Sequence, residues 1–275
     1  MAALLALVAA LLWGLGGFLG GQASRRAALI PVLAVELLVG TIVIIPLAFL
    51  TAHRFAWVDL LIGGAAGFFG LLGVTFLYRG LRGPMAAVAP VAGVVSAALP
   101  LLWGVGFGER LSAWQIYGVI LGLMSIVLIS DTGRALHRIS LGPLVNGVLA
   151  GAGFGAGYIV LDATDPLTAP WPILGARLLP AFAVCAVAFT AHQPPSAVGP
   201  ARLWSVGAGI STVLASVAFL AAINRGLLST SSVLSCLHPA VTVLLARLFL
   251  RERISPSQAT GLTVAVAAIS MITAG

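Results

Sequence analysis

Charged residues are scarce in this sequence, and lysine is absent. Of its 275 residues only 8% are charged, whereas 60% are hydrophobic, and the mean hydropathy is +1.14. Soluble domains carry about 25% charged residues. The composition therefore excludes an ordinary soluble domain and predicts a polytopic membrane protein that is embedded in a lipid bilayer.

Cysteine is also scarce, and the two that are present, Cys185 and Cys236, lie inside apolar runs. Neither a disulfide nor a metal site is indicated. The 14 basic residues are all arginine. They lie singly or in pairs at the ends of apolar runs rather than on one basic face, so nucleic acid is not an expected partner.

Catalytic motifs are missing as well. The sequence has no His-Glu-x-x-His zinc motif, no phosphate-binding loop and no pair of aspartates in adjacent apolar segments. We therefore expect neither an enzyme nor a bound cofactor. No basic residue precedes the first apolar run, whereas Arg25 and Arg26 follow it. This order favours a retained first helix over a cleaved leader.

Long apolar segments fill almost the whole chain. A helix needs about 20 apolar residues to cross a hydrocarbon core of about 30 Å. By this measure the sequence predicts an all-α polytopic membrane protein with ten transmembrane helices, at residues 2–20, 30–50, 58–79, 84–107, 112–130, 142–162, 170–190, 201–224, 229–250 and 255–274. The connections are short, so no soluble domain is expected between the helices.

Two stretches of the chain share the same sequence features in the same order. The Arg-Gly-Leu sequence at 79–81 recurs at 225–227, and Glu-Arg followed by an aliphatic residue and a serine at 109–112 recurs at 252–255. A glutamine and then a glycine follow at the same spacing in both copies. The chain is therefore predicted to be a duplicated unit whose function lies between the two copies.

Each copy holds five predicted helices, the first copy in residues 1–133 and the second in residues 134–275. Because five is odd, the second copy must cross the membrane in the opposite direction. Inverted repeats of this kind place the substrate in a central cavity near the membrane midplane and let the two sides open alternately. Ten arginines lie in the connections after odd-numbered helices and three in the others, which predicts that both termini face outward.

Glu36 and Arg177 are the two charges well inside predicted helices, at equivalent positions of the two copies. Intramembrane charges are costly and are expected to face protein or water. Each lies roughly 9 Å deep at 1.5 Å per residue. The inverted topology then leaves about 12 Å of depth between them on a ~30 Å core. We interpret them as a structural network; recognition of a charged or zwitterionic ligand is the alternative.

Prolines inside the predicted helices free backbone carbonyl groups and mark sites of bending. Pro90 and Pro100 lie in the fourth helix and Pro239 in the ninth. His238 stands next to Pro239, near the middle of its helix. This imidazole is either an interhelical hydrogen-bond donor or part of the substrate path.

Small and polar residues recur at helical spacing on three predicted helices. Gly118 and Gly122, echoed by Gly261, form a strip that would seat either a second copy of the chain or the other half. Serines within 229–235 either line a wet path or satisfy backbone carbonyl groups. The spacing alone leaves both pairs of alternatives open.

These features together resemble the EamA-type branch of the drug/metabolite transporter superfamily. The resembling positions, in chain order, are Trp13-Gly14, Arg177, Arg-Gly-Leu at 225–227, Pro239, Glu-Arg at 252–253 and Gly261. The resemblance covers essentially the whole chain. It implies a basket-like bundle of ten helices, a cavity lined mainly by helices 1, 3, 4, 6, 8 and 9, and export of amino acids or other small metabolites by alternating access.

The first copy departs from the family pattern at two positions. It has Glu36 where the pattern favours arginine, and Ser96 where the pattern favours the proline that the second copy keeps as Pro239. We therefore do not expect the two halves to have equal roles.

The predicted function is export of amino acids or similar small metabolites across a bacterial inner membrane by a multi-pass secondary transporter. The predicted substrate-binding residues are Trp13, Tyr78, Trp103, Tyr158, Asn224 and His238. Pro90, Pro100 and Pro239 are the predicted flexing points. A monomer would suffice, and a dimer is possible. The alternatives are proton-coupled efflux of lipophilic cations, with Glu36 as the counter-charge, and an intramembrane enzyme or a sensor scaffold.

Overall fold

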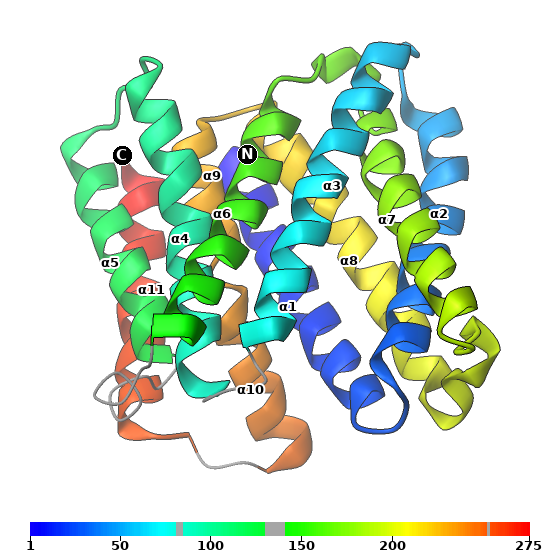
Figure 1. Ribbon diagram of the computed structural model, residues 1–275. Coiled ribbons are helices and arrows are strands. Elements are labelled where there is room, and N and C mark those ends of the chain that lie inside the picture. The colour runs from blue at the N-terminus through cyan, green and yellow to red at the C-terminus, as the bar shows by residue number, and fades with distance from the viewer. Residues whose placement is uncertain (81–84, 130–140, 252–253) are drawn as a thin grey trace.

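The computed structural model describes residues 1–80, 85–129, 141–251 and 254–275 (Figure 1). The side chains of residues 78–80, 85–90 and 143 lie outside the description, which therefore does not place the side chains of Tyr78 and Pro90. The longer helices are α1 (Ala2–Ser24), α2 (Leu29–Thr51), α3 (Trp57–Gly80), α4 (Met85–Gly106), α5 (Ala113–Ile129), α6 (Leu141–Asp162), α7 (Trp171–Thr190), α8 (Arg202–Ile223), α9 (Leu228–Ser235), α10 (His238–Leu250) and α11 (Pro256–Ala274). Two 3₁₀ segments, η3 (Pro166–Thr168) and η4 (Pro195–Ala201), precede α7 and α8.

The helices have the length and composition of membrane spans. Within the described residues, eight helical segments are long and apolar enough to cross a membrane, and α9 with α10 counts as one of them. Two shorter apolar helices, Val91–Gly106 and Ala113–Ile129, lie among them. The prediction of an all-α polytopic membrane protein is therefore confirmed, whereas a total of ten spans stays a prediction.

The predicted ninth helix is interrupted. Helix α9 ends at Ser235, Cys236 and Leu237 form a turn, and α10 begins at His238. Pro239 stands in the first turn of α10. Proline has no backbone N–H, and its ring clashes with the carbonyl group four residues earlier, so a helix that meets it either kinks or stops. At this point of the chain it stops and starts again one turn later.

The two halves pack in matching ways. Helix α1 lies along α8, and its counterpart in the other half, α6, lies along α3; likewise α4 packs on α6, while α9 and α10 pack on α1. Each helix of the second half also runs opposite to its counterpart, as α1 and α6 show, and both termini lie at the same end of the bundle (Figure 1). The helix packing therefore agrees with an inverted duplication.

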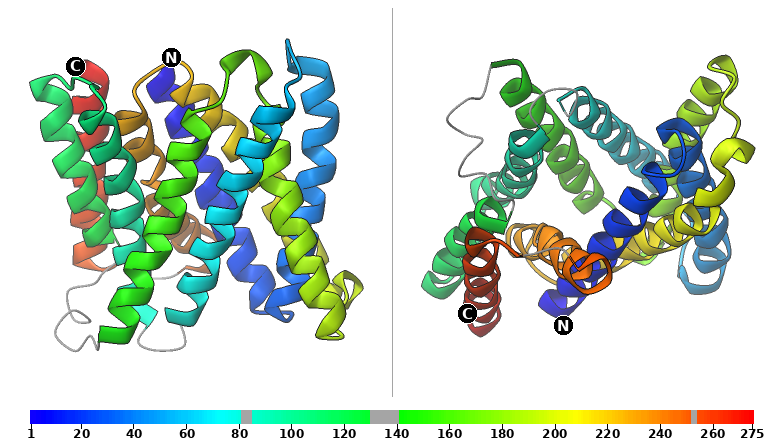
Figure 2. Two further views of the ribbon diagram at one scale, coloured as in Figure 1. Left: turned by 45° about the horizontal axis from the view of Figure 1, so that its top comes forward. Right: turned by 90° about the horizontal axis from the view of Figure 1, so that it is seen from below.

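The helices form two groups that both mix the halves. Bundle A consists of α1, α2, α8, α9 and α10, and bundle B of α3, α4, α6 and α7. Between the groups, α2 packs on α7, and α4 packs on α9. Helices α5 and α11 pack antiparallel at the edge next to α4 and α9 (Figures 1 and 2). A seam thus separates bundle A from bundle B through the middle of the molecule.

The repeated Ser-x-x-Gln sequence forms a capping box at the start of both α5 and α11. Gln115 N donates to Ser112 Oγ at 3.2 Å, and Ser112 N donates back to Gln115 Oε1 at 2.9 Å. In the second copy, Gln258 N donates to Ser255 Oγ at 3.2 Å, and Ser255 N donates to Gln258 Oε1 at 3.0 Å. These bonds satisfy backbone donors that a helix start leaves free, so part of the repeat is helix-start chemistry.

The glycines that follow these caps seat the other half of the chain. A Cβ at Gly118 would meet Ile272, and a Cβ at Gly261 would meet Ile129. Gly122 lies against Val233 of α9. Small residues at these places let α5 and α11 approach closely where lipid supplies no hydrophobic drive. In the structure this strip therefore seats the other half of the chain, which is one of the two predicted uses.

Candidate functional site

Three aromatic rings meet in the middle of the bundle. Trp13 of α1 stacks on Tyr158 of α6, with ring centroids 5.7 Å apart and an interplanar angle of 27°. Phe219 of α8 completes the group, 5.5 Å from Trp13 and 4.6 Å from Tyr158. We call these three residues the central aromatic cluster. Because Trp13 and Phe219 belong to bundle A and Tyr158 to bundle B, the cluster bridges the seam.

Polar groups adjoin the cluster at the break between α9 and α10. Tyr158 packs against the buried cluster that contains Cys236, the first residue of the break. Ser96 Oγ of α4 lies 3.5 Å from Cys236 Sγ, and both residues are buried. Ser96 is the counterpart in the first copy of Pro239 in the second. The hydroxyl group at this position thus contacts the interrupted helix of the other half.

His238 and α1 meet directly beside the cluster. Gly14, the neighbour of Trp13, packs against the His238 backbone carbonyl group. Thr242 Oγ1, one turn further along α10, donates to the Gly14 carbonyl oxygen at 3.1 Å. The start of α10 is therefore fixed against the segment of α1 that carries Trp13. His238 itself is partly buried.

Glu36 and Arg177 belong to one polar network through α8. Thr212 Oγ1 donates to Glu36 Oε1 at 3.2 Å, and Arg177 Nη2 donates to Ser216 Oγ at 3.0 Å. Ser216 Oγ in turn donates to the Thr212 carbonyl oxygen at 2.9 Å. The two charges therefore reach each other through hydroxyl groups one helical turn apart. These hydrogen bonds join α7 of bundle B to α2 and α8 of bundle A, and the role of the two charges stays a prediction.

The serine-rich helix α9 is wholly buried. Ser229 Oγ donates to the Leu101 carbonyl oxygen of α4 at 3.3 Å, and Ser235 Oγ donates to the Ala6 carbonyl oxygen of α1 at 3.2 Å. These two serines satisfy backbone carbonyl groups of neighbouring helices, which is the second of the two predicted roles. Helix α9 is thereby tied to both bundles.

Trp103 and Asn224 lie away from the three rings. Trp103 is 45% exposed and lies beside Phe107, with ring centroids 4.2 Å apart and planes tilted by 30°. Asn224 follows the end of α8 and lines a pocket of about 520 Å³, together with Arg225 and His53. Pro100 is buried against Gly155 of α6. The structure thus brings Trp13, Tyr158 and the start of α10 together, whereas Trp103 and Asn224 lie elsewhere.

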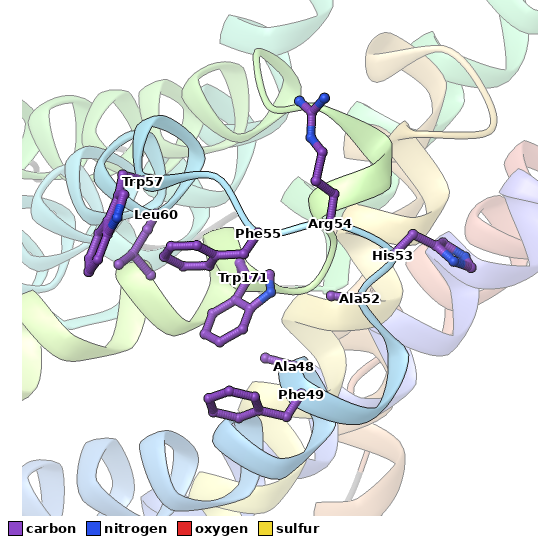
Figure 3. A pocket seen from close by; sticks show the side chains of 9 residues that line it. All are labelled: Ala48, Phe49, Ala52, His53, Arg54, Phe55, Trp57, Leu60 and Trp171. Atoms are coloured by element: carbon purple, nitrogen blue, oxygen red, sulfur yellow. The ribbon is translucent and has the colours of Figure 1, made fainter.

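A second pocket, of about 590 Å³, lies at the connection between α2 and α3 (Figure 3). Trp171 stands edge-on to Phe49 and Phe55, with centroids 4.9 and 4.8 Å away. The Arg54 side chain points away from the rings in Figure 3 and forms an ion pair with Asp165 at 2.8 Å. Exposed aromatic rings beside a charged pair at a helix end are typical of the membrane interface. This groove contains none of the predicted substrate-binding residues.

Sequence reasoning assigned no contact to three residues that join the two halves, Phe219 and Cys236 at the centre and Glu109 at the end of the bundle. Phe219 is one of 12 phenylalanines, and nothing in its local sequence distinguishes it. Cys236 was noticed for its burial in an apolar run, but its contact with Ser96 spans 140 residues. Glu109 carried a signal, because a glutamate recurs at 252 in the second copy, but its contacts with Leu228 and Ser229 span 119 and 120 residues.

Comparison with known proteins agrees with the repeat and with the fold. The model of the EamA-like transporter family matches the chain twice, at residues 1–131 and 142–274. None of the curated proteins matches. Among solved structures 29 chains match; one, described simply as the crystal structure of a protein, has a TM-score of 0.81 and 20% identity over 99% of this chain and 96% of its own. Because the family match covers nearly the whole sequence in two copies, the chain belongs to the EamA-like transporter family, in the drug/metabolite transporter superfamily.

Proposed function

We propose that the protein exports amino acids or similar small metabolites across the cytoplasmic membrane of a bacterium by alternating access. Membership in the family makes it a membrane transporter of small molecules. The observation that supports this mechanism best is the stacking of Trp13 on Tyr158 across the seam, next to an interrupted helix. A substrate bound at this place would lie between bundle A and bundle B. The two bundles would then move apart on one side of the membrane at a time.

Bundles A and B are the moving units in this proposal. The helices of bundle B are the counterparts, in the other half of the chain, of the helices of bundle A, and both bundles have the same packing. Because the repeats are inverted, the same motion in each bundle would open opposite sides of the membrane. The proposed frame has ten spans in two inverted repeats, residues 1–133 and 134–275. Pro100 and Pro239 are the proposed flexing points. Pro100 lies where α4 packs on α6 of the other half, and Pro239 lies where the ninth predicted helix is interrupted.

The chemistry of the centre favours neutral amino acids with bulky or aromatic side chains. Aromatic faces of Trp13, Tyr158 and Phe219 offer stacking surfaces. His238 and the hydroxyl group of Ser96 would hold the zwitterionic end. Asn224, in the pocket at the end of α8, would contact the substrate on its way to the side of the termini.

Replacing Trp13 with alanine tests this site. The W13A variant should need about tenfold more substrate for half-maximal counterflow in liposomes, because loss of one aromatic contact costs about 1.4 kcal/mol. Trp103→Ala is the matched control, since it removes an exposed tryptophan outside the cluster. Equal effects of the two substitutions would remove the cluster from the site. If the native protein never exceeds empty liposomes with any amino acid or metabolite, export of these compounds is wrong.

Efflux of lipophilic cations receives less support. That mechanism needs Glu36 as a free counter-charge, but its carboxylate accepts a hydrogen bond from Thr212 and is electrostatically coupled to Arg177. A carboxylate with these partners is compensated from within the protein. We therefore place Glu36 in the framework of the transporter rather than in the substrate path.

Both termini are proposed to face the periplasm. They lie at the same end of the bundle, whereas the ends of α1 and α10, which Arg25, Arg26 and Arg251 follow in sequence, lie at the opposite end (Figure 1). A reporter that is active only in the cytoplasm should therefore stay inactive when it is fused after Gly275. A reporter that is active only in the periplasm should be active at the same place, and the reverse pattern would contradict the proposed orientation.

A further inference from the structure

The start of α9 is held by a carboxylate from the other half of the chain. Glu109, on the connection between α4 and α5, accepts hydrogen bonds from Leu228 N through Oε1 at 2.7 Å and from Ser229 N through Oε2 at 3.1 Å. The partners are 119 and 120 residues apart in sequence. Hydrogen bonds from a helix start to a carboxylate are charge-assisted and use the positive end of the helix dipole.

Helix α9 has no cap of its own. Its N-cap residue is Leu227, whose side chain cannot accept a hydrogen bond, whereas α5 and α11 carry local capping boxes. Leu228 and Ser229 are 1% and 0% exposed, so water does not replace the missing cap. Buried backbone N–H groups without partners are costly. Glu109 therefore supplies what the local sequence of α9 lacks.

The α4–α5 connection is shaped to deliver this carboxylate. Glu109 N donates to the Gly104 carbonyl oxygen at 2.8 Å, which folds the connection back onto the end of α4. Gly108 has φ of +105°, a value that side chains other than glycine rarely adopt. A Cβ at Gly104 would collide with the Glu109 carboxylate and with Ser229 Oγ. Gly108 thus permits the backbone conformation of the connection, and Gly104 leaves space for the Glu109 carboxylate.

These contacts cross the seam at the end of the bundle that carries both termini (Figure 1). The α4–α5 connection continues bundle B, and α9 belongs to bundle A. Resting on the alternating access proposed above, we infer that Glu109 is a positioning residue that latches the transporter closed on the side of the termini. Opening on that side carries the connection away from α9, breaks both hydrogen bonds, and exposes the two N–H groups to water.

Loss of the carboxylate removes these bonds from the closed state alone, so the open state gains population. The distance between spin labels at Phe107→Cys, on the connection, and Arg225→Cys, just before α9, reports the opening in a Cys185→Ser background, in which the remaining Cys236 is 1% exposed and is not labelled. Both label sites are exposed. In Glu109→Ala the population at the longer distance should increase about fivefold, the typical effect of losing a helix cap.

Two further variants make the test specific. Glu109→Gln keeps one of the two oxygen acceptors and should give a smaller shift. Asp162→Asn removes a carboxylate at the end of α6 that caps no helix start, and it should leave the distances unchanged. A distribution in Glu109→Ala equal to that of the background overturns the latch. If Glu109→Ala does not fold, an unchanged distribution in Glu109→Gln overturns it.

The distances are measured without substrate, which separates this inference from the proposed function. A shift in a protein that transports no tested substrate supports the latch and counts against amino-acid export. If Glu109→Ala retains counterflow and its distance distribution does not shift, the latch is wrong and the export proposal is unaffected.

Discussion

Replacing Gly63 with valine should prevent most of the protein from folding. Gly63 of α3 lies against the backbone of Pro172 in α7, and an added Cβ would collide with the Pro172 carbonyl group. The contact is reciprocal, because a Cβ at Gly175 of α7 would collide with the Leu60 carbonyl group of α3. Backbone atoms cannot rotate away as side chains do. We expect a loss of about 3 kcal/mol or more, at the upper end of overpacking effects.

The yield of monodisperse protein after detergent extraction, followed by thermal unfolding, measures this loss. Gly70→Val is the matched control, because it lies in the same helix and a Cβ there has no atom within 4 Å. G70V should be extracted and should unfold like the native protein. Equal behaviour of the two variants would show that the close approach of α3 to α7 is not what Gly63 provides.

Removing the charge of Arg177 alone should destabilise the protein more than removing it together with the charge of Glu36. In Arg177→Met, Glu36 keeps its hydrogen bond from Thr212 but loses its compensating charge, and an uncompensated buried charge costs about 3 kcal/mol or more. In the Glu36→Gln, Arg177→Met double variant both charges are absent. We expect the double variant to regain at least about 1 kcal/mol of this loss.

Thermal unfolding of the native protein, both single variants and the double variant gives the interaction between the two sites. Ser216→Ala adds a control, since it removes the hydroxyl group that accepts from Arg177 without removing a charge. Additive losses in the double variant would mean that Glu36 and Arg177 do not act as one network. The proximity of the pair would then be incidental to stability.

Hydropathy predicted the class of the protein because a membrane span is a long and nearly uniform apolar segment. Each predicted helix overlaps a described helical segment, and the predicted ninth overlaps two, α9 and α10; that there are ten spans stays a prediction. The interruption at Cys236 and Leu237 also follows from a local cause, Pro239. Repeated features such as Ser112 and Gln115 were recognisable for the same reason, since a capping box uses neighbours in sequence.

The centre was predictable only in part, because it depends on which face each helix turns to its neighbours. Trp13 and Trp103 look alike in sequence, being tryptophans next to glycine in apolar runs, yet the first joins Tyr158 and the second is 45% exposed. The predicted depths of Glu36 and Arg177 in the membrane indicated that the two side chains would not pair directly without a bridging group. That Thr212 and Ser216 would supply this bridge depends on the rotation of α8, which hydropathy does not encode.

The contact between α5 and α11 obeys the rule of an isologous interface. Gly118 meets Ile272, and the equivalent Gly261 meets Ile129, as in a dimer with two-fold symmetry. In its packing the chain thus corresponds to two antiparallel subunits joined covalently. A true homodimer would place two glutamates or two arginines where this chain has Glu36 and Arg177. Fusion into one polypeptide allows one of each, so the charges in the membrane can compensate each other.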